Sequence, residues 1–277
     1  MPFVAVGEEN SRPIELYYED HGSGTPVVLI HGYPLDGRSW EKQEAALLAA
    51  GHRVIAYDRR GFGKSSQPGF GYDYDTFARD LDVLLTELDL RDVALVGFSM
   101  GTGEVTRYLG TYGSTRVTKA VLLAPLPPFL LRTDDNAEGL DKELFDGFVA
   151  AAGGDRPAFM TGFLSEFYNY DVYAGSLVSE ERFRASWNTA TAASAIASVE
   201  CIPAWLTDFR ADLPKIDVPV LVMQGDQDRV LPPDRTGNRL PGSVSNLARH
   251  VVIEGGPHAI IWTHAEQVNA ALLDFLK

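Results

Sequence analysis

A serine flanked by glycines, placed between a strand pattern and a helix pattern, is the feature that most restricts how this chain can fold. Residues 97–101 read Gly-Phe-Ser-Met-Gly, directly after the β-branched run 92–96 and directly before the helical pattern 102–112. A turn this sharp strains the backbone of Ser99, so the residues two positions away must be small. The alternative interpretation is a Gly/Ser turn without chemistry. We expect a turn that presents the Ser99 hydroxyl as a nucleophile at the edge of a sheet.

Strand and helix patterns alternate through the first half of the chain. Short apolar runs are typical of strands covered on both faces, and they occur at residues 26–30, 53–57, 93–96 and 117–123. Helical patterns lie between them at residues 40–50 and 75–88. This βαβ alternation predicts a parallel sheet. Together with the serine turn it predicts the α/β-hydrolase fold. That fold implies a mostly parallel eight-stranded sheet with helices on both faces, and we expect a helical cap insertion.

The pattern changes in the middle of the chain. From residue 127 to residue 214, strand runs give way to short helical stretches rich in Phe, Tyr and Trp. These aromatic residues either fill a small core of the cap or line an apolar substrate pocket, and both interpretations stay open. Strand patterns return afterwards, and a closing helix is expected from residue 264 to residue 276. We predict a hydrolase core at residues 1–126 and 215–277, with a helical cap at 127–214.

Composition narrows the classes of partner. The formal charge of −14 argues against binding to nucleic acid or to anionic membranes. The single cysteine, Cys201, excludes an internal disulfide framework. Residues 1–10 lack a basic region followed by an apolar run, so we expect no signal peptide. No stretch approaches the roughly 20 apolar residues of a membrane helix, and we expect a cytoplasmic protein without a membrane partner.

A nucleophilic serine needs a general base, and the base needs an orienting carboxylate. In this fold the chain order is serine, then acid, then histidine. Of the six histidines, His258 alone lies in a Gly/Pro loop after a late strand. Asp226 and Asp228 follow the strand pattern that ends at Gln224, at the sheet edge where such sites form. Both aspartates are candidates for the orienting carboxylate.

An acyl-transfer site also needs two backbone N–H donors for the developing oxyanion. One is predicted at Met100, which follows the nucleophile. The second is predicted at Tyr33, in the loop after strand 27–30. His31 could be mistaken for a second base, but we expect it to hydrogen-bond locally and hold this loop. The candidate pocket residues are Tyr33, Phe98, Leu126, Trp205 and Ile260.

Five segments together resemble the cofactor-free haloperoxidase (perhydrolase) group of α/β-hydrolases, whose close relatives include aryl esterases and a γ-lactamase. They are YDRRGFG at 57–63, GYDYDTF at 71–77, GFSMGTGE at 97–104, TDFRAD at 207–212 and WTHA at 262–265. The resemblance implies a triad of Ser99, Asp228 and His258, with Met100 and Tyr33 as oxyanion donors. It also implies a homo-oligomer, either a trimer or a dimer of trimers.

The chain departs from this group at two places. Residues 123–129 read Leu-Ala-Pro-Leu-Pro-Pro-Phe where relatives usually show Ser-Leu-Glu-Pro, and Ala259 replaces a usual glycine. The departure at residues 123–129 bears on the substrate profile, not on the chemistry. We expect the extra prolines to stiffen the entrance to the cap.

The expected function is that of a serine hydrolase of esters and carboxylic acids, with perhydrolase and hence haloperoxidase activity. Its reactants would be a small-molecule ester, carboxylic acid or lactam, with hydrogen peroxide and a halide. No metal or cofactor is expected, because no metal-ligand cluster or dinucleotide loop stands out. One alternative is a γ-lactamase or amidase on the same triad, and another is a non-catalytic small-molecule receptor. Haloalkane dehalogenases and epoxide hydrolases are disfavoured because they need a carboxylate where Ser99 stands.

Overall fold

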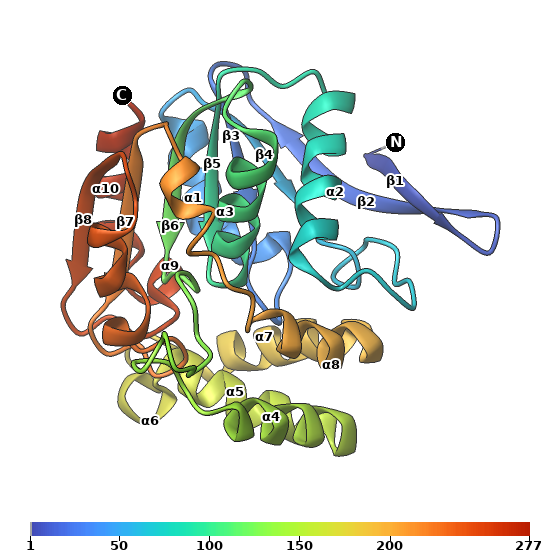
Figure 1. Cartoon of the computed structure of the whole chain (residues 1–277), viewed down its shortest axis with the longest axis vertical. Coiled ribbons are helices and arrows are strands. Elements are labelled where there is room, and N and C mark those ends of the chain that lie inside the picture. Colours follow the sequence, from blue (N-terminus) through green and yellow to red (C-terminus); the bar gives the residue numbers. More distant parts are fainter. Residues whose placement is uncertain (1) are drawn as a thin grey trace.

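The computed structural model describes residues 2–277, and its centre is one sheet of eight strands (Figure 1). The strands are β1 (Phe3–Glu9), β2 (Arg12–His21), β3 (Pro26–Ile30), β4 (Arg53–Tyr57), β5 (Val93–Phe98), β6 (Val117–Leu123), β7 (Val220–Gly225) and β8 (Leu247–Ile253). Their order in the sheet is β1-β2-β4-β3-β5-β6-β7-β8. From β4 to β8 all neighbours are parallel, whereas β1 and β2 join antiparallel. The predicted fold class is confirmed. Met1, where the first predicted core segment begins, lies outside the described residues.

Helices cover both faces of this sheet. They are α1 (Glu41–Ala49), α2 (Tyr74–Glu87), α3 (Met100–Tyr112), α9 (Ile260–Thr263) and α10 (Ala265–Leu276). Successive residues of a strand point to opposite faces. Val28 and Ile30 therefore belong to the core cluster that contains α2 and α3. Val27 and Leu29 belong to the cluster that contains α1 and α10. Burial on both faces explains why these strands are continuous apolar runs in the sequence.

A helical insertion between β6 and β7 covers one end of the sheet, at the bottom of Figure 1. Its helices are α4 (Lys142–Gly154), α5 (Arg156–Tyr168), α6 (Tyr170–Tyr173), α7 (Glu180–Ala192) and α8 (Ala195–Ala204). Short 3₁₀ helices occur at η1 (Gly37–Trp40), η2 (Leu213–Lys215), η3 (Pro233–Arg235) and η4 (Gly237–Gly242). We call α4–α8 the cap. The predicted domain limits at residues 127 and 214 stay a prediction.

Local chemistry explains where several elements begin. Asp73 precedes α2, and its carboxylate accepts a hydrogen bond of 2.8 Å from the N–H of Thr76, which caps the helix. In β1 only Val4 and Val6 are buried, because this strand lies at the antiparallel edge of the sheet. Within residues 2–277, no helix has both the length and the apolar character needed to cross a membrane.

Candidate active site

Ser99 lies at the sharp turn between β5 and α3, with φ 55° and ψ −121°. Residues other than glycine rarely adopt this backbone conformation. The flanking glycines allow three elements to meet here. A Cβ on Gly97 would lie 2.6 Å from the carbonyl oxygen of Gly101, and a Cβ on Gly101 would overlap the carbonyl oxygen of Ile30 in β3. The strained turn is therefore held by close backbone packing, as the sequence motif predicts.

His258 lies in the loop that follows β8, and its ring joins Ser99 to Asp228. Its Nε2 atom is 2.8 Å from Ser99 Oγ, and its Nδ1 atom is 2.7 Å from Asp228 Oδ2. An ionised carboxylate only accepts hydrogen bonds, so Nδ1 must carry the proton that it donates to Asp228. Nε2 is then free to accept the hydroxyl proton of Ser99. The rings of Phe98 and Phe167 lie 5.1 Å from the buried imidazole and restrict its rotation.

The two candidate aspartates have different surroundings. Asp228 is buried, and its Oδ1 atom accepts hydrogen bonds from the N–H groups of Val230 and Leu231 at 2.9 and 2.7 Å. These bonds orient the carboxylate towards His258. Asp226 is exposed and accepts a hydrogen bond of 2.8 Å from the N–H of Gly255. Asp226 thus braces the loop that carries His258 and does not touch its ring.

The predicted oxyanion donors lie on either side of Ser99. Met100 is the first residue of α3, so its N–H has no partner within the helix and lies at the positive end of the helix dipole. The loop after β3 comes so close that a Cβ on Gly32 would lie 2.8 Å from Ser99 Cβ. Within residues 2–277, neither Met100 nor Tyr33 uses its N–H in a hydrogen bond to the protein. Their assignment as oxyanion donors stays a prediction.

His31 is fully buried at the start of this loop, and within residues 2–277 its ring makes no hydrogen bond to Ser99. Its Nδ1 atom is 2.9 Å from the carbonyl oxygen of Gly32, and its Nε2 atom accepts a hydrogen bond of 2.9 Å from the N–H of Arg59. Burial, and then the nearby charge of Arg59, hold the pKa of His31 well below its ordinary value. A neutral ring with both nitrogens bonded fits a brace for the loop, which is the local role expected for it.

An apolar cavity of about 500 Å³ opens over Ser99, a size typical of small-molecule sites. Tyr33, Leu126 and Trp205 lie in its wall, at positions proposed from the sequence. Four phenylalanines of α4 and α5 complete one side, and they are Phe145, Phe148, Phe159 and Phe163. Among the described lining residues, only Glu166 and Arg229 carry a charge.

Two predicted pocket positions need correction, because Phe98 and Ile260 are not among the residues that line this cavity. Phe98 is buried under the imidazole of His258 and packs edge-on against Trp40 and Phe167. Ile260 begins α9 and is fully buried. The spacing of Phe159, Phe163 and Phe167 by four residues marks one face of a helix and is the signal that could have found the cap's contribution.

Similarity to known proteins agrees with the observed fold. The family model described as "alpha/beta hydrolase fold" matches residues 25–265. The chain belongs to the α/β-hydrolase family. It is 61% identical to a predicted non-heme chloroperoxidase from Synechocystis sp., over 100% of both chains. It is 35% identical to a bifunctional esterase/perhydrolase from Acinetobacter calcoaceticus, which covers 95% of this chain and 96% of the relative.

A solved structure extends this similarity to three dimensions. The crystal structure of a bromoperoxidase from Bacillus anthracis matches this hydrolase with a TM-score of 0.94 and 47% identity, covering 99% of this chain and 98% of the other. The resemblance to the cofactor-free haloperoxidase and perhydrolase group is therefore confirmed.

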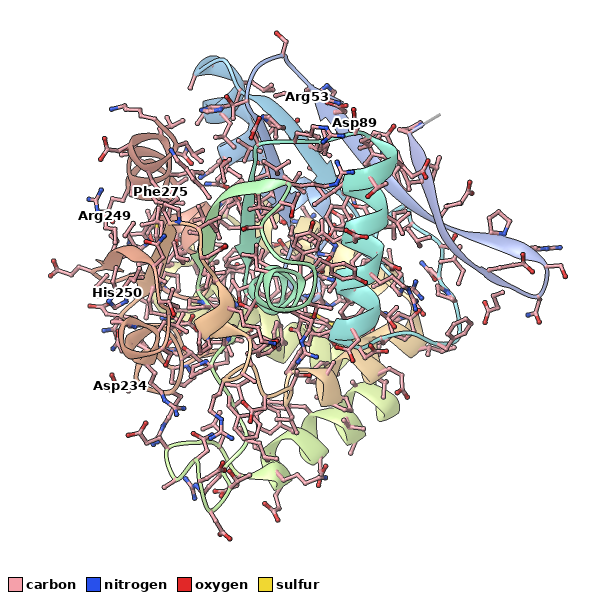
Figure 2. The ribbon with its side chains drawn as sticks, turned by 45° about the horizontal axis from the view of Figure 1, so that its top comes forward. Arg53, Asp89, Asp234, Arg249, His250 and Phe275 are labelled. Atoms are coloured by element: carbon pink, nitrogen blue, oxygen red, sulfur yellow. The ribbon has the colours of Figure 1, made fainter. Side chains whose placement is uncertain are left out.

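In the described part of the chain, the remaining histidines of the hydrolase make no hydrogen bond to Ser99. His250 lies on the edge strand β8 next to Arg249, as Figure 2 shows. The Nδ1 atom of His264 is 2.9 Å from Thr263 Oγ1, at the junction of α9 and α10. Burial lowers the pKa of both His250 and His264. His52 lies in the turn before β4.

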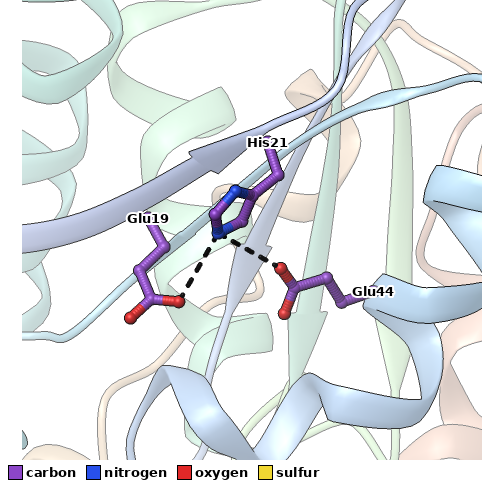
Figure 3. A group of neighbouring side chains, drawn as sticks. All are labelled: Glu19, His21 and Glu44. Atoms are coloured by element: carbon purple, nitrogen blue, oxygen red, sulfur yellow. Dashed lines mark ion pairs between the residues drawn. The ribbon is translucent and has the colours of Figure 1, made fainter.

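His21 belongs to a surface group of side chains that no sequence motif indicates. Its Nε2 atom lies 3.7 Å from Glu19 and 3.8 Å from Glu44, between β2 and α1 (Figure 3). These three side chains are of the types that bind metal ions. Lys64 also lies 3.4 Å from Glu19, so the group belongs to a partly exposed cluster of polar and charged side chains. It does not line the cavity over Ser99.

Proposed function

We propose that this protein is a serine esterase and perhydrolase that works through an acyl-enzyme. The observation that carries the proposal is the continuous hydrogen-bonded chain from Ser99 through His258 to Asp228 at an apolar cavity. A serine, a base and an orienting carboxylate in this order form the constellation used for nucleophilic acyl transfer. The similarity to a bifunctional esterase/perhydrolase supports the same chemistry.

In the proposed ester hydrolysis, His258 Nε2 takes the proton of Ser99 as Oγ attacks the acyl carbon. The tetrahedral intermediate places its negative oxygen against the N–H groups of Met100 and Tyr33. His258 returns the proton to the leaving alcohol, and the acyl group remains on Ser99. Water, activated by His258, then attacks the acyl-enzyme. The carboxylic acid leaves and Ser99 regains its proton.

Perhydrolysis uses the same steps with different reactants. A carboxylic acid acylates Ser99 and releases water, and hydrogen peroxide then attacks the acyl-enzyme in place of water. The new acyl–oxygen bond yields a peracid and frees Ser99. The peracid oxidises bromide to hypobromous acid outside the site and returns to the carboxylate. Halogenation is therefore a secondary reaction of an acyl-transfer enzyme.

Ser99→Ala tests the proposal. Triad residues act as a unit, so the variant should lose about 10³-fold or more of its turnover of a p-nitrophenyl ester. In the unchanged protein, phenylmethylsulfonyl fluoride should add one sulfonyl group, located on Ser99 by peptide mass analysis. Full turnover in the variant would exclude this mechanism, and absence of turnover in both proteins would favour a receptor.

Assembly into a trimer or a dimer of trimers stays a prediction that light scattering can measure.

A further inference from the structure

Arg59 is a buried cation two residues after the end of β4, and it makes two hydrogen bonds to His31, the first residue of the loop that carries Tyr33. Its backbone N–H donates a hydrogen bond of 2.9 Å to His31 Nε2. Its Nη2 atom donates a hydrogen bond of 2.8 Å to the carbonyl oxygen of His31. The side chain is 1% exposed. These two bonds fix His31, the first residue of the loop, through both its ring and its backbone carbonyl group.

The same guanidinium also binds the helix that carries Met100. Arg59 Nε donates a hydrogen bond of 2.7 Å to Glu104 Oε2, and Glu104 is a fully buried residue in the second turn of α3. The hydroxyl of Tyr57 donates to the other oxygen of Glu104. One side chain therefore connects the loop after β3 to the helix after the nucleophile.

This connection matters because the two predicted oxyanion donors belong to separate elements. Met100 belongs to α3, whereas Tyr33 lies in a loop beyond the end of the β3 ladder. Oxyanion stabilisation depends on donors held within about 0.5 Å of the productive position. A buried ion pair is often no more stabilising than an apolar pair of the same size. The buried ion pair does, however, have directional hydrogen bonds that fix a specific geometry, and an apolar pair lacks them.

We propose that Arg59 is a positioning residue that sets the separation of the two oxyanion donors. The proposal rests on the function proposed above for Ser99. Arg59 does not line the cavity and acts through His31 on one side and Glu104 on the other. Lysine at this position keeps the charge but presents a single nitrogen, which cannot reproduce the guanidinium fork.

Arg60 provides a matched control. It is the next residue in the chain and is equally buried, and its guanidinium binds Asp80 of α2 through two hydrogen bonds of 2.6 and 2.8 Å. Its remaining hydrogen bond goes to the carbonyl oxygen of Phe70. Arg60→Lys therefore disrupts a comparable buried pair whose hydrogen bonds do not involve the loop after β3 or α3.

The experiment compares Arg59→Lys with Arg60→Lys in three measurements on the full chain. These are the melting temperature, kcat and KM for p-nitrophenyl acetate, and inhibition by phenylboronic acid, whose adduct on Ser99 places an oxygen in the oxyanion site. Both variants should lose similar thermal stability. Arg59→Lys should lower kcat by about 10-fold, less than the 10²-fold typical of a deleted donor. Its KM should change by less than about twofold, and phenylboronic acid should bind about 10-fold more weakly, because only stabilisation of the transition state is lost.

Arg60→Lys should keep kcat within about twofold of the unchanged protein. Unchanged kcat in Arg59→Lys, or equal losses in both variants, would overturn the proposal. If Arg59→Lys does not fold, Tyr57→Phe decides by the same measurements, with an expected loss in kcat of about threefold and unchanged kcat as the contrary result. Failure of the proposed function would look different, because Ser99→Ala would then retain turnover.

Discussion

The hydroxyl of Tyr33 donates a hydrogen bond of 2.8 Å to the carbonyl oxygen of Ser198 in α8. The ring of Tyr33 also packs edge-on against Trp205 and Phe163, with ring centroids 4.9 and 5.4 Å away. The residue whose backbone N–H is a predicted oxyanion donor is thus fixed to the cap by its side chain. The position of the cap and the geometry of the oxyanion site are coupled through this one residue.

Tyr33→Phe should measure this coupling. The change removes one buried hydroxyl and leaves the backbone N–H in place, so stability should fall by about 1 kcal/mol. We expect kcat for p-nitrophenyl acetate to fall about two- to fivefold, far less than after loss of a donor. Tyr168→Phe is the control, because the Tyr168 hydroxyl bonds Ser186 inside the cap at 2.8 Å. A similar loss of kcat in both variants would argue against the coupling.

Asp228→Asn and Asp226→Asn should behave differently. Asp228→Asn removes the carboxylate that orients His258, so the imidazole takes the wrong tautomer and kcat should fall by about 10⁴-fold while the fold persists. Asp226→Asn changes only the bond to the N–H of Gly255, so the loss should stay below about 10-fold. Steady-state kinetics and circular dichroism of both variants provide the comparison. A larger loss in Asp226→Asn would mean that the orienting carboxylate is misassigned.

Bromination should depend on acyl transfer. With a phenolic dye as acceptor, the reaction should need hydrogen peroxide, bromide and a short carboxylic acid such as acetate at the same time. The rate should fall as the pH rises above the pKa of the carboxylic acid, because an anion is costly to bring into the apolar cavity. Ser99→Ala should abolish the reaction. Undiminished bromination in buffer free of all carboxylates would exclude an enzyme-made peracid.

His31 should make stability depend on pH below neutrality. Its folded-state pKa is lowered well below 6.5 by burial and by Arg59, so below pH 6.5 the unfolded chain binds the proton more readily than the folded one. The stabilising contribution is therefore present above pH 6.5 and is lost as the pH falls, by up to about 1.4 kcal/mol per pH unit. Urea unfolding from pH 7.5 to 5 should show the stability of the unchanged protein approaching that of His31→Gln. A constant difference between the two would contradict this prediction.

Much of the fold could be read from the sequence because burial imposes simple patterns. The runs at residues 26–30, 53–57 and 117–123 coincide with β3, β4 and β6, which are covered on both faces. The edge strand β1 has no such run and was not among the predicted strands, because only one of its faces is buried. Its register with β2 also shifts between Ala5 and Gly7, which interrupts the alternation.

Some residues of the candidate site could likewise be predicted from local sequence patterns, and others could not. Ser99 and His258 could be proposed because glycines and proline mark their turns locally. The orientation of Phe98 could not, since it depends on the packing of β5 against Trp40 and Phe167. The pairing of Arg59 with Glu104 was equally hidden, because it joins residues from two elements that only the sheet topology brings together.

The apolar cavity over Ser99 also affects how readily each product of the proposed reaction leaves the site. An ester enters as a neutral molecule, but its acid product is ionised at neutral pH and then carries a charge in a cavity whose wall is mainly apolar. Release of the carboxylate product is thereby favoured without a conformational change of the protein. A peracid is a weaker acid than its parent carboxylic acid, so at the same pH it remains neutral. It can therefore stay in the cavity longer or bind there again. The apolar wall would thus retain the neutral peracid longer than the ionised carboxylate. The ratio of the two products in the cavity would then change with pH even if every rate constant at Ser99 stayed the same.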